Sequence, residues 1–319
     1  MNFDIIRDKL KSLLEKAVQN NLAKGILLSG GLDTSILATI ASKYNGLKAF
    51  TVALKKAPAL DIKFAKLMAE NLQINHVIHF FDKSELLDAI SKTIEIMRSF
   101  DPMEIRNSAA IYIGMKIAKE NGIKAIMTGD GADELFGGYS FFFGKSEEEL
   151  TIELKKISNI MSFSSILLGK SLGIEAKLPY LDPEFKKFSL DIPSRYKVFK
   201  EKGKIIGKWI LRKSFEKDLP KEIIWRDKAP IEQGSGTYIL PNLFNQEISD
   251  TEFNEKKRKY FKEDNVSIRD KEQLFYYELY RKSLGIPHPT DPKQKICPHC
   301  NSNVRNEANF CKTCGAYPI

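Results

Sequence analysis

Apolar residues recur along the first half of the chain with two alternating periods. Residues 3–19 carry their apolar positions at helical spacing, which predicts an amphipathic helix ahead of the first strand. Short apolar runs then alternate with helix-like runs as far as residue 128. The predicted strands cover residues 25–28, 49–54, 76–81 and 125–128, and the predicted helices cover residues 34–44, 61–72, 84–99 and 108–120. This alternation predicts an α/β fold, a parallel sheet with helices on both faces.

The second half of the chain has a different pattern. Beyond residue 147 the strand signal fades, and helices with loops are predicted through residue 283. A proline-rich stretch then predicts a linker, and all four cysteines follow it. We therefore expect three parts: a main domain over residues 1–285, a linker over 286–295 and a small metal-binding module over 296–319.

The composition of the 319 residues is that of an ordinary globular protein, with 43% hydrophobic and 29% charged residues. A chain of this length can bury a large core. No apolar stretch approaches the roughly 20 residues of a membrane span, and the first residues do not resemble a signal peptide. We expect a cytoplasmic protein.

The formal net charge is +9, and lysines are dense at residues 200–213 and 256–262. Such a balance is typical of nucleic-acid binding, but a lysine-rich proteome or a site for anionic substrates explains it equally well. RNA remains a less favoured partner.

The stretch Ser29-Gly30-Gly31-Leu32-Asp33-Thr34-Ser35 follows the first predicted strand and precedes a predicted helix. Glycines allow the backbone to approach a ligand closely, and a helix N-terminus offers unpaired N–H groups to an anion. The Asp33 carboxylate would oppose a phosphate unless a divalent cation lay between them. The stretch therefore predicts a site for ATP together with Mg²⁺.

A second unusual loop follows the strand at 125–128. Residues 128–139 hold four glycines and three carboxylates, which belong to Asp130, Asp133 and Glu134. Ligands of parallel sheets bind beyond the carboxyl ends of the strands, so both loops should face one cleft. The second loop would then supply a second metal carboxylate to the same phosphates.

All four cysteines fall in the last 23 residues, as two C-x-x-C pairs with ten residues between them. Four thiolates at this spacing can close a tetrahedron around Zn²⁺, and a metal can fold a segment too small for its own core. The predicted ligands of this zinc ribbon are Cys297, Cys300, Cys311 and Cys314. A redox dithiol pair is the alternative, and His299 is expected not to be a ligand.

The first loop resembles the S-G-G-x-D-[ST]-S fingerprint of the PP-loop ATPases, which bind the pyrophosphate of ATP and release AMP. With three further stretches the chain resembles the synthetase domain of the glutamine-type asparagine synthetases and their β-lactam synthetase relatives. These stretches occur in the family's order: residues 129–139, residues 173–182, and residues 208–212 followed by 219–220 and 226–228.

The resemblance implies a nucleotide site. Asp33 and Asp133 would hold Mg²⁺, and the strand at Thr51 and Val52 would border the adenine. Arg106 is a further candidate for phosphate contact. The residues expected to contact ATP or its pyrophosphate are Ser29, Gly30, Gly31, Asp33, Thr34, Ser35, Thr51, Val52, Arg106, Gly129 and Asp130.

The resemblance also implies residues that act on the acyl group. Asp130 would assist reaction at the acyl-adenylate, although many asparagine synthetases carry glutamate there, and Lys228 would neutralise charge on the phosphates and the tetrahedral centre. An ordinary surface lysine is the alternative for Lys228. The residues expected near the acyl substrate are Glu134, Glu175, Lys177 and Asp182, with Glu175 counted as catalytic. Lys177 replaces an arginine that is usual in the family, which weakens bidentate binding of a carboxylate there. For Glu175 and Asp182 the alternative to substrate contact is a structural role.

The implied reaction is ATP-dependent adenylation of a carboxylate, with aspartate as the leading substrate, followed by transfer of ammonia to form an amide. Relatives that use glutamine begin with a glutaminase domain whose nucleophile follows the initiator methionine, whereas position 2 here is Asn2. We therefore expect free ammonia, a separate glutaminase subunit or another nucleophile.

A PP-loop enzyme that modifies tRNA or a carrier protein is the alternative function. A third interpretation makes the ribbon a module that docks a glutaminase or a carrier protein, and it is compatible with either reaction.

Overall fold

The computed structural model describes residues 3–44, 46–201 and 203–319. Contacts along the chain divide it into two compact units, each of which is described by itself. The first unit consists of Met1–Thr51, Leu60–His79 and Gly114–Pro230, and the second consists of Val52–Ala59, Phe80–Ile113 and Ile231–Ile319.

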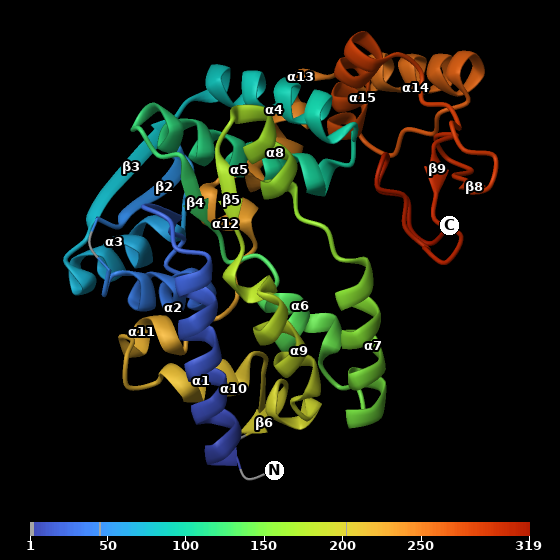
Figure 1. Ribbon diagram of the computed structural model, residues 1–319. Coiled ribbons are helices and arrows are strands. Elements are labelled where there is room, and N and C mark those ends of the chain that lie inside the picture. The colour runs from blue at the N-terminus through green and yellow to red at the C-terminus, as the bar shows by residue number, and fades with distance from the viewer. Residues whose placement is uncertain (1–2, 45, 202) are drawn as a thin grey trace. The chain divides into compact units, whose positions relative to one another are not determined.

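A five-stranded parallel sheet has the order β3-β2-β1-β4-β5 (Figure 1). The strands are β1 Gly25–Leu27, β2 Lys48–Leu54, β3 Asn75–Phe81, β4 Ala125–Met127 and β5 Glu175–Lys177. The chain runs outward from β1 through β2 to β3 and then returns to place β4 on the other side of β1. The order therefore reverses between β1 and β4, and this is where open α/β sheets bind their ligands.

The helices of the first half agree with the apolar pattern. They are α1 Phe3–Asn20, α2 Leu32–Ala41, α3 Asp61–Leu72, α4 Lys83–Met97 and α5 Pro102–Glu120. The predicted α/β fold with a parallel sheet is confirmed. Helix α5 begins six residues before the predicted start, at Pro102, because proline suits the first position of a helix.

The prediction that strands end before residue 147 was wrong. Strand β5 lies at the edge of the sheet and pairs with β4, with Ala176 opposite Ile126. Strands β6 Phe199–Glu201 and β7 Lys204–Ile206 form an antiparallel pair. These strands have three residues each, too few for an alternating pattern, so pairing with a neighbour rather than local sequence defines them.

The remaining helices follow in chain order. They are α6 Ala132–Phe136, α7 Glu147–Ile160, α8 Ser164–Leu172, α9 Pro183–Asp191, α10 Trp209–Phe215, α11 Lys221–Ile224, α12 Ile231–Ser235, α13 Leu240–Glu247, α14 Asp250–Asp264 and α15 Lys271–Leu284. Short 3₁₀ turns cover Ser140–Phe142, Pro179–Leu181, Ser194–Tyr196 and Thr237–Ile239. The last strands are β8 Lys295–Ile296 and β9 Asn303–Val304, which pair antiparallel.

The core of the first unit forms along the apolar face of α1. Ile6, Leu10 and Leu14 are at most 1% exposed, and α1 packs against α2, α9 and α10. Each such side chain contributes about 1.5–3 kcal/mol by leaving water. The same core reaches Leu28 at the end of β1 and Ala132 at the start of α6, so it supports both loops at the switch point.

In the second unit α4 packs against α15. Phe100 follows α4 and is fully buried, with its ring centroid 5.1 Å from that of Tyr277 and 5.2 Å from that of Tyr280. These edge contacts join the connection between α4 and α5 to one face of α15.

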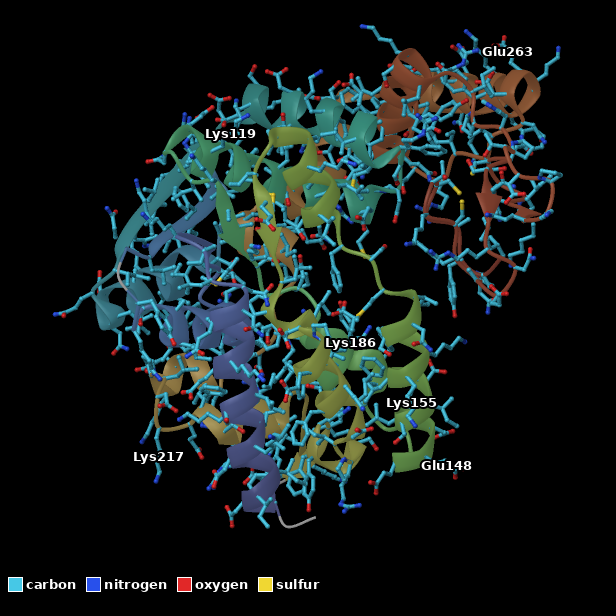
Figure 2. The ribbon with its side chains drawn as sticks, viewed as in Figure 1. Lys119, Glu148, Lys155, Lys186, Lys217 and Glu263 are labelled. Atoms are coloured by element: carbon cyan, nitrogen blue, oxygen red, sulfur yellow. The ribbon has the colours of Figure 1, made fainter. Side chains whose placement is uncertain are left out.

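Lysines carry much of the positive charge at the surface. Lys119, Lys155 and Lys217 extend into solvent (Figure 2). Among the described residues, no helix is both long enough and apolar enough to cross a membrane.

Candidate active site and the cysteine cluster

The loop that follows β1 is closed by its own hydroxyl groups. The Oγ atom of Ser29 lies 3.0 Å from Oγ1 of Thr34 and accepts a hydrogen bond from Gly31 N at 3.2 Å. Gly31 is the N-cap residue of α2 and, as glycine, supplies no side-chain cap. The first N–H groups of α2 are therefore available to an anion, which the helix dipole also attracts.

Gly30 fits this loop because it has no side chain. Its φ is +63°, in the left-handed region that favours glycine. A Cβ at this position would lie 2.3 Å from the carbonyl carbon of Phe64 in α3. The loop therefore packs directly on the backbone of α3.

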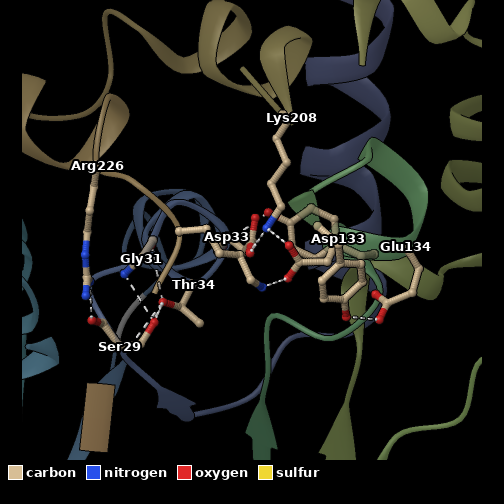
Figure 3. A network of polar contacts seen from close by, with 12 residues as sticks. Ser29, Gly31, Asp33, Thr34, Asp133, Glu134, Lys208 and Arg226 are labelled. Carbon is tan, nitrogen blue, oxygen red and sulfur yellow. Dashed lines mark hydrogen bonds and ion pairs between the residues drawn. The ribbon is translucent and has the colours of Figure 1, made fainter. Parts of the chain in front are cut away.

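The loop after β4 meets the first loop, as predicted. A Cβ on Gly129 would lie 3.2 Å from Cβ of Asp33 and 3.1 Å from Cγ2 of Thr34, so the two loops are in contact at this glycine. Helix α6 begins a few residues later and carries Asp133 toward Asp33 (Figure 3).

A buried lysine joins these two carboxylates. The Nζ atom of Lys208 lies 2.5 Å from Oδ2 of Asp33 and 2.7 Å from Oδ1 of Asp133 (Figure 3). Lys208 is 4% exposed and precedes α10 with a positive φ of 55°. Sequence reasoning assigned no role to it, although it begins the stretch at residues 208–212 that supported the resemblance.

The cluster of charges is electrically balanced. Burial disfavours the carboxylate of Asp133, but the ammonium groups of Lys208 and Lys228 outweigh burial and lower its pKa to about 2. Burial raises the pKa of Asp33, which Lys208 only partly opposes. Burial opposes the charge of Lys208 as well, yet the two carboxylates raise its pKa.

Lys228 reaches the same cluster from the chain segment after α11. Its ammonium donates to Oδ2 of Asp133 and lies 5.0 Å from the ring centroid of Tyr139. The hydroxyl of Tyr139 donates to Glu134 at 2.6 Å. Lys228 is therefore more than an isolated surface lysine, and its catalytic role stays a prediction.

Arg226 is a second residue that sequence reasoning did not assign. Its guanidinium donates to the carbonyl of Ser29 at 3.0 Å (Figure 3). It also donates to Asp61 at 2.8 Å and lies 4.2 Å from the ring centroid of Phe64. Three contacts from one planar group fix the start of the first loop to α3.

Asp130 lies between two hydroxyl groups. Oδ2 accepts from Oγ1 of Thr128 at 2.9 Å and from Oγ of Ser165 in α8. Burial raises the pKa of Asp130, and the two hydroxyl donors partly oppose the rise. Ser165 was not foreseen, because α8 lies 35 residues further along the chain.

The residues predicted near the acyl substrate have partners of their own. Glu175 and Lys177 form an ion pair of 2.6 Å within β5, with 65% of the Glu175 side chain exposed. Asp182 is the N-cap of α9, where Oδ1 accepts from the backbone N of Glu184 at 3.2 Å, and its Oδ2 accepts from Asn20 at 3.0 Å. These contacts favour the structural alternative for Asp182.

Arg106 and the strand predicted to border the adenine complete the predicted set. The hydroxyl of Thr51 donates to the carbonyl of Leu28 at 2.5 Å, and Val52 follows in β2, where it is half-buried. In the second unit Nε of Arg106 lies 3.1 Å from Glu232 and 3.5 Å from Glu272.

The four cysteines form one buried cluster. All are at most 1% exposed, and their sulfur atoms lie within 4.8 Å of one another. Sγ of Cys297 is 3.7 Å from that of Cys314, and Sγ of Cys300 is 3.6 Å from that of Cys311. These distances are too long for disulfide bonds. A tetrahedral zinc site with bonds of about 2.3 Å requires sulfur atoms about 3.8 Å apart, which the cluster matches.

The sheet order, the glycine loop before α2 and the facing carboxylates define an α/β protein with a candidate anion-binding site at the switch point of its sheet. A family model described as asparagine synthase matches residues 6–164 and 168–279. The chain belongs to this family.

Curated relatives agree with this assignment. The chain is 30% identical over 315 residues to a probable glutamine-hydrolysing asparagine synthetase of Dictyostelium discoideum, with 89% of this chain and 55% of the relative covered. It is 29% identical over 316 residues to the glutamine-hydrolysing asparagine synthetase of Zea mays, with 91% of this chain and 52% of the relative covered. The chain thus spans about half the length of these relatives.

Among solved structures, the chain is similar to an NMN synthetase from Francisella tularensis, with a TM-score of 0.31 and 18% identity. The match covers 60% of this chain and 94% of that chain.

Proposed function

We propose that this protein adenylates a carboxylate with ATP and then transfers ammonia to the acyl-adenylate, which yields an amide, AMP and pyrophosphate. The observation that carries the proposal is the Asp33, Lys208 and Asp133 cluster beside the uncapped start of α2. This arrangement joins donors for an anion to carboxylates suited to a metal, as release of pyrophosphate requires.

The glycine loop would bind the pyrophosphate part of ATP. The first N–H groups of α2 supply donors, and the hydroxyls of Ser29 and Thr34 border them. Arg226 keeps this loop in place through the carbonyl of Ser29. Thr51 and Val52 would border the adenine, and the role proposed for Arg106 is contact with phosphate.

The carboxylates of the cluster fit a divalent cation. Oδ1 of Asp33 is buried and has no hydrogen-bond partner among the described residues, so it can serve as a ligand. Asp33 and Asp133 would hold Mg²⁺, which supplies positive charge to the departing pyrophosphate. The ammonium of Lys208 supplies one positive charge to the same two carboxylates.

In the first step a substrate carboxylate oxygen attacks the α-phosphorus of ATP, and the bond to pyrophosphate breaks. In the second step ammonia forms a bond to the acyl carbon, the bond to AMP breaks and the nitrogen loses a proton. Lys228 would neutralise charge on the phosphates and at the tetrahedral centre. Asp130, held by Thr128 and Ser165, would assist at the acyl-adenylate, with Glu175 as a further catalytic candidate.

Aspartate is the proposed acyl substrate, which would make asparagine the product. The names of the relatives support this choice. Glu134 and Lys177 are the proposed neighbours of the acyl group, whereas the role proposed for Asp182 is the structural one, as the N-cap of α9. The proposed nitrogen donor is ammonia, either free or delivered by a separate glutaminase.

The cysteine cluster would hold one structural Zn²⁺. Four buried sulfur atoms at tetrahedral spacing suit a closed thiolate site, in which all four positions are occupied by the protein. A redox pair would need access to partners, and all four sulfurs lie in buried residues.

The test is release of pyrophosphate by the purified protein with ATP, Mg²⁺ and ammonia across a panel of carboxylic acids, with and without tRNA. Release with aspartate and formation of asparagine is the expected result. Asp133→Asn should abolish release, and Asp8→Asn, a change at a carboxylate that is 72% exposed, is the matched control. Release that requires tRNA or a carrier protein would contradict the proposal and favour a PP-loop modifying enzyme.

A further inference from the structure

The second C-x-x-C pair is bonded to the connection between α4 and α5. The backbone N of Phe100 donates to the carbonyl of Thr313 at 2.7 Å, and Oγ of Ser99 donates to the carbonyl of Lys312 at 2.8 Å. Both carbonyls belong to the two residues between Cys311 and Cys314. The metal-binding turn is therefore a hydrogen-bond partner of residues more than 200 positions earlier in the chain.

The same turn also lies against Asp101 and α15. A Cβ on Gly315 would lie 2.2 Å from Oδ1 of Asp101, so the side chain of Asp101 packs directly on the backbone of Gly315. Arg269 donates to the carbonyl of Gly315 at 2.8 Å and lies 3.7 Å from Asp101. Nε2 of Gln273, in α15, donates to the carbonyl of Cys314 at 2.7 Å.

The first C-x-x-C pair is bonded to a different segment. The backbone N of Ser267, between α14 and α15, donates to the carbonyl of His299 at 2.8 Å. Nδ2 of Asn301 donates to the carbonyl of Asn265 at 3.2 Å. The first half of the cysteine cluster is thus bonded to the segment between α14 and α15. The second half is bonded both to residues 99–100 and to residues at the start of α15.

We propose that the metal at the four cysteines is a clasp that closes the second unit, holding Ser99–Asp101 and the segment from α14 to α15 in one arrangement. The thiolates join the two halves. The first half adds its bonds to the segment between α14 and α15, and the second half is bonded to both Ser99–Asp101 and the start of α15. Residues 296–319 have few buried apolar side chains outside the cysteines, so metal binding would supply much of the energy that orders them. The clasp also fixes the start of α5, which carries Arg106 one turn later.

The proposal rests on the metal site proposed above, and it assigns that site a role inside the second unit. A ribbon that serves only as a tethered docking module would leave Ser99–Asp101 and α15 unchanged when its metal is lost. A clasp would not. We expect this change in Ser99–Asp101 and α15 to be confined to the second unit, because the loop at residues 29–35 belongs to the first unit.

Hydrogen–deuterium exchange on the intact protein tests the clasp. Zinc content is measured on the same samples, and the protein is compared before and after a zinc chelator and with Cys311→Ser. Loss of zinc should speed exchange at residues 98–103 and 264–277 by about tenfold or more, while residues 26–36 keep their protection. His299→Gln, which leaves all four thiolates in place, is the matched control and should behave as the unchanged protein does.

A second variant keeps the test sharp if Cys311→Ser does not fold. Arg269→Gln leaves every cysteine intact and removes the donor to Gly315, so it should retain one zinc per chain and still exchange faster at residues 98–103. Unchanged protection in zinc-free protein would overturn the clasp, even with one zinc bound in the native protein. Absence of any bound metal would overturn the site as well. Failure to release pyrophosphate would contradict the proposed function, but it would leave the results on zinc binding and on hydrogen exchange unchanged.

Discussion

Replacing Lys208 by methionine tests the electrostatic balance of the active-site cluster. Methionine keeps an unbranched side chain but lacks the ammonium that lies 2.5 Å from Asp33 and 2.7 Å from Asp133. Both carboxylates then remain in a buried position, with Lys228 still bonded to Asp133. The net charge of the four groups changes from zero to one negative charge.

The cost follows from burial. Removal of one partner from a buried ion pair destabilises a protein by about 3–5 kcal/mol, because it leaves an uncompensated charge. We expect Lys208→Met to lower the free energy of unfolding by this amount at pH 7, measured by urea denaturation. Lys228→Met is the matched control: the side chain of Lys228 is 37% exposed, so its loss should cost about 1 kcal/mol or less.

Mg²⁺ provides the second readout. In Lys208→Met a divalent cation can take the place of the ammonium, so Mg²⁺ without nucleotide should raise the urea midpoint. A ligand at 100 times its dissociation constant stabilises by about 2.7 kcal/mol. The unchanged protein should respond much less, because Lys208 already neutralises the site. A variant within about 1 kcal/mol of the unchanged protein, or an equal response of both to Mg²⁺, would refute this reasoning.

Three further predictions concern stability. Burial lowers the pKa of Lys197 from 10.5 to about 7. Below pH 10.5 the unfolded chain therefore binds this proton more readily than the folded protein does, so the free energy of unfolding of the unchanged protein should rise with pH between about 7 and 10.5. Lys197→Met should remove this rise and increase the free energy of unfolding by up to about 5 kcal/mol at pH 7, but by only about 1 kcal/mol at pH 9.5. An equal increase at both pH values in urea denaturation would contradict a lowered pKa for Lys197. Gly30→Ala should lower the free energy of unfolding by about 2–3 kcal/mol and lower the melting temperature, because φ of Gly30 is +63° and a Cβ would meet Phe64. An unchanged melting temperature would contradict the close contact between this loop and α3. The pKa of Asp133 falls from 3.8 to about 2 on folding, so its stabilisation is present above pH 3.8 and is lost as the pH falls to 2. The stability difference between the unchanged protein and Asp133→Asn should therefore shrink over that range, and a constant difference would exclude an ionised Asp133 as its source.

The sequence predicts those features that local patterns determine. Helix α3 covers residues 61–72 as its apolar spacing predicts, and the four cysteines cluster as their pairing predicts. Both loops at the switch point meet because parallel strands place their carboxyl ends at one edge of a sheet.

Features that depend on distant contacts could not be predicted in this way. Lys208 meets Asp33 across 175 residues, and Arg226 meets Ser29 across 197. Strand β5, with the residues Glu-Ala-Lys, has no apolar alternation and is defined by β4. The bonds of the cysteine turns to Ser99 and Gln273 likewise depend on the packing of the whole second unit.

The most direct test of the central claim follows the oxygen atoms of the substrate. Aspartate labelled with ¹⁸O in its side-chain carboxylate is incubated with ATP, Mg²⁺, ammonia and the protein, and the nucleotide product is analysed by mass spectrometry. If the carboxylate attacks the α-phosphorus, the product is AMP that carries one ¹⁸O atom. Formation of ADP, or of AMP without the label, would contradict adenylation of the carboxylate.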